Sequence, residues 1–151
     1  MSLDGWTLTS GTVDLVRSTS GTAREGQQSI DLNGTSPGSL RRTFVTAPGW
    51  AYRLDFDLSG NPIGAGVRTL KVRVNGTEVR QFEWDPVAKG NSFHLDMKWE
   101  HQVVGFEADS ASTTIELTSL TLGTSGPQID NLTFFLVEET PVSVESALIL
   151  S

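Results

Sequence analysis

The sequence lacks cysteine and long apolar runs, and it has few basic residues. Because none of its 151 residues is cysteine, a disulfide framework, a thiolate metal site and a cysteine nucleophile are excluded. No apolar run is longer than four residues, far short of the roughly 20 that a membrane-spanning helix needs. Eleven Lys and Arg stand against 18 Asp and Glu, a net charge of −7 that argues against a nucleic-acid partner. The chain is therefore expected to fold around a core of its own.

Turn-forming pairs recur along the chain and separate short alternating segments. Gly-, Pro- and Asn-rich turns bound segments of about 5 to 10 residues, which is typical of a β-sandwich or barrel. The clearest strand covers 50–58, where apolar residues alternate with Arg53, Asp55 and Asp57. No stretch shows a long helical period. The pattern predicts an all-β jelly-roll sandwich of about eight or nine strands over 4–138, followed by a tail at 139–151 that is an added edge element or a linker.

Four segments together resemble a known family. They are "GWTLTSGTVDLV", "GQQSIDLNGTSPGSLRRTF", "YRLDFDLSGNP" and "GPQIDNLTF", in that order between about residues 5 and 138. Their sequence and spacing are similar to those of the exported bacterial family called choice-of-anchor C. The resemblance implies a galactose-binding-like β-sandwich, an exported and surface-associated protein, and an association with polysaccharide. It does not imply a particular ligand, because one fold carries many functions.

The chain departs from that family at its start. The family's opening strand, of the form N-G-S-F-E, is absent ahead of Trp6, and its Glu is a plausible ligand for structural calcium. No family anchor is recognisable after residue 140. The family's calcium site is therefore in question here.

Motifs for catalysis are missing. The sequence has no G-x-S-x-G, no H-E-x-x-H and no phosphate-binding glycine loop, and its histidines are His94 and His101. Asp55 and Asp57 lie about 7 Å apart along one strand, within reach of inverting glycosidase geometry. A solvated strand surface beside Arg53 explains this pair better. We expect a protein that is not an enzyme.

Calcium is the favoured metal, because it accepts carboxylate and backbone oxygens in a flexible geometry. Asp130 shares the parity of the apolar residues 132, 134 and 136, so we expect it to point toward the core at the rim of the sheet. A carboxylate placed there must be paired, hydrogen-bonded or bound to metal. Glu25 or Asp31 is the expected second ligand, and the alternative is a structural Asp130 that caps amides or pairs with an arginine.

Arg42 breaks the alternation of its strand, because it lies between Leu40 and Phe44 on their face. A buried guanidinium needs a carboxylate, and Asp130 is the expected partner. If that face is open, Arg42 becomes a ligand contact instead.

The Asn75-Gly76 turn leaves two registers open. A two-residue turn without a bulge places Phe82 and Trp84 on the polar face, where Trp84 beside Arg73 would form a sugar platform. A shift by one residue sends both aromatic side chains into the core, which is the commoner outcome. The register therefore tests the platform.

The long segment 85–98 is the second candidate site, because binding residues collect in loops on a rigid scaffold. It carries His94, and Trp99 follows it directly. Trp6 and Trp50 start strands and are expected to be partly buried packing residues.

These observations predict a non-catalytic, exported, cell-surface module that binds a polysaccharide or other glycan, with structural calcium as its only expected cofactor. The rival hypothesis is a structural or adhesive envelope domain that contacts proteins and binds no small ligand. A hydrolase is the least favoured of the three.

Overall fold

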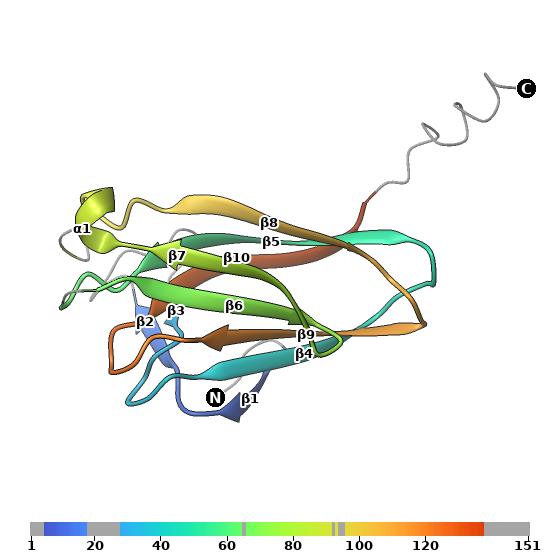
Figure 1. Cartoon of the computed structure of the whole chain (residues 1–151), viewed down its shortest axis with the longest axis horizontal. Helices are drawn as coiled ribbons and strands as arrows, with labels where there is room; N and C mark the ends of the chain where they lie inside the picture. Colours follow the sequence, from blue (N-terminus) through green and yellow to red (C-terminus); the bar gives the residue numbers. More distant parts are fainter. Residues whose placement is uncertain (1–4, 18–27, 65, 92, 94–95, 138–151) are drawn as a thin grey trace, which may run out of the picture.

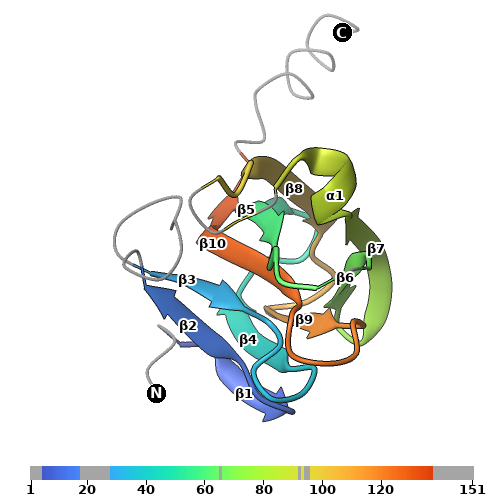
Figure 2. The ribbon, with the colours of Figure 1, turned by 90° about the vertical axis from the view of Figure 1, so that its left-hand side faces the viewer.

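The chain forms a β-sandwich whose two layers are drawn in Figures 1 and 2. The computed structural model describes residues 5–17, 28–64, 66–91, 93 and 96–137. Within these residues lie ten strands and one short helix. In chain order they are β1 (Thr7–Ser10), β2 (Asp14–Arg17), β3 (Gln28–Asp31), β4 (Ser39–Val45), β5 (Ala51–Gly60), β6 (Arg68–Val74), β7 (Thr77–Trp84), α1 (Pro86–Lys89), β8 (Glu100–Glu107), β9 (Ser112–Ser119) and β10 (Pro127–Leu136).

The strands form two five-stranded antiparallel sheets. Sheet A has the order β1-β4-β9-β6-β7, and sheet B has the order β2-β3-β10-β5-β8. Strand connections gather at two ends. The α1 end carries α1 and the β3–β4, β5–β6 and β9–β10 connections, and the opposite end carries the β4–β5, β6–β7 and β8–β9 turns (Figure 1). The predicted all-β sandwich is confirmed, with ten strands among the described residues where about eight or nine were predicted.

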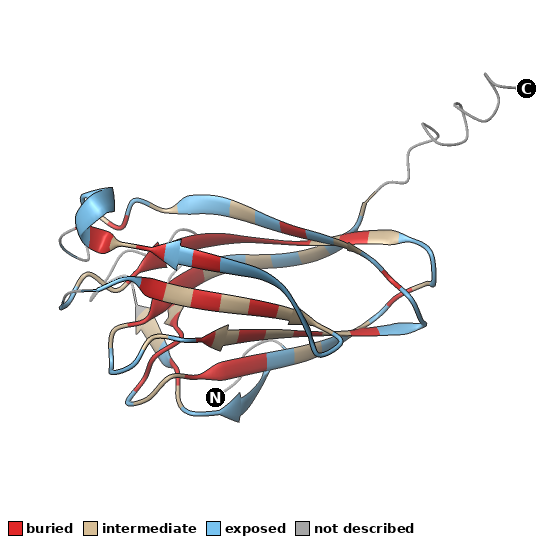
Figure 3. Cartoon of the chain, in the orientation of Figure 1, coloured by how far each residue is buried: buried red, intermediate tan, exposed pale blue. Residues whose placement is uncertain are grey.

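The core lies between the sheets, and alternation along the strands explains it. Leu54, Phe56 and Leu58 of β5 are at most 2% exposed, as the pattern predicted. Phe44 of sheet A stacks on Phe134 of sheet B with ring centroids 3.8 Å apart, which ties the layers together. Figure 3 shows the resulting bands of buried and exposed residues along the strands.

The short helix α1 has clear start and stop signals. The Asp85 side chain accepts a hydrogen bond from the Val87 amide, and Gly90 ends the helix with φ of 73°. No helix in the described part of the chain is long and apolar enough to cross a membrane. The predicted tail at 139–151 lies outside the described residues.

Candidate functional site

A polar row runs along β5 on the outer face of sheet B. Because Leu54, Phe56 and Leu58 point into the core, Arg53, Asp55 and Asp57 point outward. The two aspartates are nevertheless only 6% and 4% exposed. Our interpretation of this pair as a solvated strand surface was therefore wrong: neighbouring side chains cover both carboxylates.

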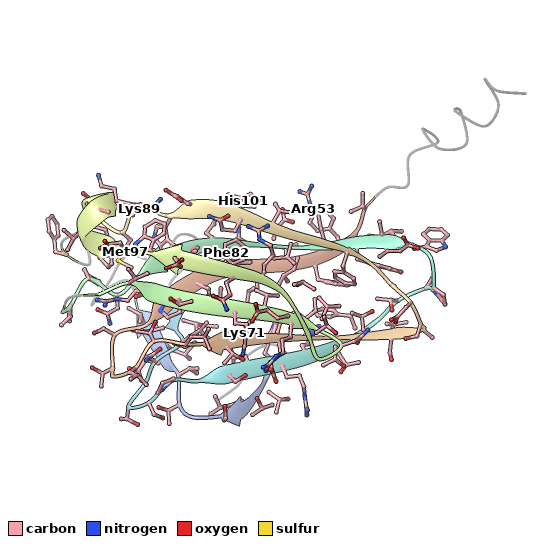
Figure 4. All side chains as sticks on the ribbon, in the orientation of Figure 1. Arg53, Lys71, Phe82, Lys89, Met97 and His101 are labelled. Atoms are coloured by element: carbon pink, nitrogen blue, oxygen red, sulfur yellow. The ribbon has the colours of Figure 1, made fainter. Side chains whose placement is uncertain are left out.

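His101 on β8 covers the two aspartates from one side. Its Nε2 lies 3.0 Å from Asp55 Oδ2, and its Nδ1 lies 3.3 Å from Asp57 Oδ1. The β5–β8 register creates this contact, since His101 is the direct cross-strand partner of Asp57. Both ring nitrogens donate to carboxylates at once only when both carry a proton. Figure 4 labels His101 beside β8, on the same side of the molecule as Arg53.

Arg53 covers Asp55 from the other side. Its Nε and Nη2 lie 2.8 and 2.9 Å from the two oxygens of Asp55, an ion pair of bidentate form. Its guanidinium also lies over the Phe135 ring of β10, 4.5 Å from the centroid. We call Arg53, Asp55, Asp57, His101 and Phe135 the Asp–His face. His101 and Arg53 have side chains 54% and 40% exposed, so the face is open to solvent above its buried carboxylates.

Trp84 is not part of an open surface. It is 1% exposed, and its indole Nε1 donates to Asn91 Oδ1 at 2.8 Å. The turn at Asn75-Gly76 does pair Val74 with Thr77, but a bulge follows, and Val72 then pairs with Arg80. This extra residue rotates Phe82 and Trp84 into the core. The structure therefore excludes the Trp84 platform and confirms the alternative register.

The two arginines that were candidate ligand contacts, Arg73 and Arg42, also have structural partners. Arg73 lies on the outer face of sheet A, where its Nη1 is 2.8 Å from Glu116 Oε1. Arg42 stacks on the neighbouring Phe44 ring at 4.8 Å from the centroid. The expected partnership between Arg42 and Asp130 is wrong, because Arg42 lies on the inner face of sheet A and Asp130 on the outer face of sheet B.

A bulge explains the misplaced Asp130. Asp130 pairs with Asp57, whereas Thr133 pairs with Asp55, so β10 has one residue more than β5 in this stretch. Asn131 absorbs the extra residue in the left-handed region, with φ of 55°. Asp130 therefore points outward, next to the Asp–His face, and only the residues after the bulge follow the predicted parity.

Asp31 is the more enclosed of the two predicted metal ligands that the structure describes. Its carboxylate accepts hydrogen bonds from the Asn33 and Gly126 amides and from Asn61 Nδ2, at 2.8, 3.1 and 2.7 Å. Burial raises the pKa of Asp31 from 3.8 to about 6, against the opposite effect of these hydrogen bonds. Asp31 and Asp130 lie on the same face of sheet B, because Asp31 pairs with Gln128. Glu25 lies outside the described residues, and among those described no three His, Asp or Glu side chains are arranged to hold a metal ion.

The second predicted site is only partly described. His94 lies outside the described residues, and Trp99 is half-buried just before β8. The Trp99 Nε1 atom is buried and has no hydrogen-bond partner in the described chain. Its role in ligand binding stays a prediction.

Comparison with known proteins places the chain in a family. A family model described as "Protein of unknown function (DUF642)" matches residues 1–135. The chain belongs to the DUF642 family. This DUF642 chain is also 29% identical over 133 residues to halomucin of Haloquadratum walsbyi, covering 86% of the chain. It spans only 1% of the length of that relative.

Solved structures share the fold of this DUF642 domain. A family 35 carbohydrate-binding module from Clostridium thermocellum has a TM-score of 0.60 at 15% identity, covering 87% of this chain and 92% of that one. TmCBM61 in complex with β-1,4-galactotriose has a TM-score of 0.60 at 17% identity, covering 89% of this chain and 90% of that one. The CBM22-1 xylan-binding domain of Paenibacillus barcinonensis Xyn10C has a TM-score of 0.61 at 16% identity, covering 92% of this chain and 90% of that one. At these identities the likeness establishes the fold.

Sequence reasoning missed two features of the DUF642 domain. It assigned no role to His101, whose contacts with Asp55 and Asp57 depend on the cross-strand register. It also treated Trp50 as a packing residue, yet Trp50 is 48% exposed. The sequence signal for this exposure is the Pro48-Gly49 turn directly before Trp50, which indicates a position outside the sheet.

Proposed function

We propose that this DUF642 domain is a non-catalytic carbohydrate-binding module of an exported, surface-associated protein, and that it binds glycan on the Asp–His face. One observation carries the proposal. On this solvent-open face, an arginine and a histidine are held in place by two buried carboxylates. The face is built on a fold shared with carbohydrate-binding modules of families 35, 61 and 22.

Sugar hydroxyls accept as well as donate hydrogen bonds, and the Asp–His face presents N–H donors to them. Arg53 and His101 carry these donors at the surface, and the buried carboxylates of Asp55 and Asp57 hold them in place. The ion pairs and the stacking of Arg53 on Phe135 already fix these groups, so less side-chain freedom is lost when a ligand binds. Together with Asp130 the face has an excess of negative charge, which favours neutral sugars over uronic acids.

The relatives support the export and ligand parts of this proposal. Halomucin is similar over most of this chain, one structural neighbour is in complex with β-1,4-galactotriose, and another is a xylan-binding domain. The four motifs shared with the choice-of-anchor C family point the same way. The alternative is an adhesive envelope module that contacts proteins and binds no small ligand, with which the similarity to halomucin is equally consistent.

Structural calcium is a second part of the proposal. Gln128, which is fully buried, has a side-chain oxygen Oε1 for which no described residue supplies a partner, although its Nε2 donates to Ser29 Oγ at 2.8 Å. Gln128 lies two positions from Asp130 on the same face, so these residues offer two oxygens of the kind that Ca²⁺ accepts. Asp31 is a weaker candidate, because three N–H groups already donate to it. Bound there, calcium would supply charge neutralisation and hold β10 in place.

The test is binding of the purified domain to β-1,4-galactan, xylan and polygalacturonate, with calcium and again with a chelator. We expect saturable binding to a neutral polymer and at least tenfold weaker binding in His101→Ala. The matched control is Glu116→Gln, which breaks the equivalent arginine pair on sheet A and leaves the Asp–His face intact.

Three results would count against the proposal. Equal binding by His101→Ala and Glu116→Gln would remove the Asp–His face as the site. A folded domain that binds none of the polymers would favour the adhesive alternative. If the chelator changes neither binding nor the melting temperature, the calcium part of the proposal is wrong.

A further inference from the structure

Trp50 is the most exposed of the four tryptophans. Trp6 and Trp84 are 9% and 1% exposed, Trp99 is half-buried, and Trp50 is 48% exposed. Among the described residues, no aromatic ring or cation stacks on the Trp50 indole. A large apolar ring thus stands in solvent at the end of the sandwich opposite α1.

The backbone that carries Trp50 is firmly held. Its amide donates to the Ala47 carbonyl at 3.2 Å, and its own carbonyl accepts from the Ala108 amide at 2.9 Å. The Gly49 amide donates to the Ala108 carbonyl at 2.8 Å, and Gly49 adopts φ of 83°, which suits glycine. The Tyr52 hydroxyl accepts from the Ala47 amide at 2.8 Å. We call residues 47–50 the Trp50 turn.

A fixed, exposed tryptophan is a typical anchor for a ligand. Binding to an aromatic side chain on a rigid turn orders little additional structure, so most of the contact energy is retained. A specific protein interface needs about 800 Å² per partner, many times what one indole supplies. A ligand about the size of a single ring fits this surface better.

We propose that the Trp50 turn is a stacking site for a pyranose ring of the glycan, separate from the Asp–His face. This rests on the proposed function. The C–H face of a pyranose is apolar and flat, as is the indole. Trp50 immediately precedes β5, so Arg53 follows it by about 10 Å along an extended strand. On this proposal, one oligosaccharide that runs along β5 contacts both the Trp50 turn and the Asp–His face.

The expected ligand is an extended neutral oligosaccharide, and binding should strengthen with length. A fragment too short to reach both places gains only one set of contacts. A longer fragment gains the second set at high effective concentration, which increases the affinity without new chemistry.

The experiment titrates the domain with β-1,4-galactan and xylan fragments of several lengths. For Trp50→Ala we expect about tenfold weaker binding of the long fragments and less dependence on length. In the wild type, binding should shift tryptophan emission to the blue and reduce quenching by acrylamide, since Trp50 is the most exposed fluorophore. Trp50→Ala should lack both signals. Ile63→Ala, which trims a 62% exposed apolar residue at the α1 end, is the control.

The outcomes separate the two proposals. If Trp50→Ala binds like the wild type while His101→Ala does not, the stacking site is wrong and the proposed function stands. If the wild type binds but its fluorescence does not change, the stacking site is also wrong. If the folded wild type binds none of the fragments, both proposals fail.

Discussion

The two ends of the sandwich are closed in different ways. At the α1 end, long Gly- and Asn-rich connections are held by buried polar side chains, and Trp84 lies beneath them. At the opposite end, short turns are held by backbone and side-chain hydrogen bonds together, and Trp50 remains exposed. The sequence makes the α1 end look functional. The comparison teaches that the hydrogen-bonding groups of polar loop residues often bind the backbone of their own loops and are not available to a ligand.

Arg68 shows how the α1 end uses its polar groups. This 2% exposed side chain donates hydrogen bonds to the carbonyl oxygens of the β5–β6 connection, at distances from 2.7 to 3.1 Å. The four acceptors belong to Asn61, Ile63, Gly64 and Gly66. A five-donor guanidinium satisfies several loop carbonyls that would otherwise need water.

Asn33 serves the β9–β10 connection in the same way. Its Nδ2 donates to the Thr121 and Gly123 carbonyls at 2.7 and 2.8 Å, and its Oδ1 accepts from the Ser119 hydroxyl. Its side chain packs so close to Gly126 that a Cβ there would lie 2.1 Å from Oδ1. These groups hold loops and have no capacity left for a ligand.

The largest expected effect separates the two tryptophans. Trp84→Ala should lower the free energy of unfolding by about 3–5 kcal/mol, because it leaves a cavity and removes the indole hydrogen bond to Asn91. Trp50→Ala should cost less than about 1 kcal/mol, because the side chain is exposed. Urea denaturation measures both, and Trp84→Phe is available if the alanine variant does not fold. Equal losses for the two alanine variants would contradict the contrast.

A smaller effect concerns pH and the α1 end. The pKa of Asp31 is about 6 in the folded chain against 3.8 ordinarily, so between these values the folded chain binds more protons than the unfolded one. Asp31 therefore makes stability fall as pH rises from about 4 to 6, by at most about 3 kcal/mol, and contributes no further slope above that.

Denaturation at a series of pH values checks this window. Asp31→Asn should flatten the slope between pH 4 and 6, whereas Asp109→Asn, an exposed change at the opposite end, should leave it unchanged. If Asp31→Asn keeps the wild-type slope, the pKa of this carboxyl is not the cause.

The smallest effect tests the β6–β7 turn at the Trp50 end. Asn75 has φ of 49°, and its Oδ1 accepts from the Thr114 amide at 2.9 Å. Asn75→Ala should cost about 1 kcal/mol, because alanine disfavours the left-handed region and cannot accept that bond. Asn75→Gly keeps the backbone conformation and should cost less. Thermal melts give the order, and a glycine variant worse than the alanine variant would contradict it.

Much of the fold was predictable because its signals are local. The alternation in β5 gave the buried face of that strand, and Asn75-Gly76 gave the β6–β7 turn. The bulge in β10 was missed and the bulge in β7 was predicted as one of two registers, although each leaves a trace. Ile129 is apolar at an odd position and Leu132 at an even one, and Val79 and Phe82 differ in the same way. A change of parity between apolar residues within one strand indicates an extra residue.

The candidate site was harder to predict because it depends on register between strands. Asp55 and Asp57 were recognised as a pair, but their burial under His101 and Arg53 needs β8 and β5 to align residue by residue. The exposure of Trp50 depends on where β5 begins. A single sequence specifies strand boundaries to within a few residues, which is too coarse to decide either point.

The bulge at Asn131 acts on β10 as a one-base insertion acts on a coding sequence. Before it, even positions such as Asp130 are read outward, and after it even positions such as Phe134 are read inward. The two parts of β10 therefore have opposite alternation of inward and outward side chains. Exchanging one outward residue for another changes a single side chain on the surface. Deleting Asn131 would instead turn every side chain on one side of the bulge to the opposite face of the sheet.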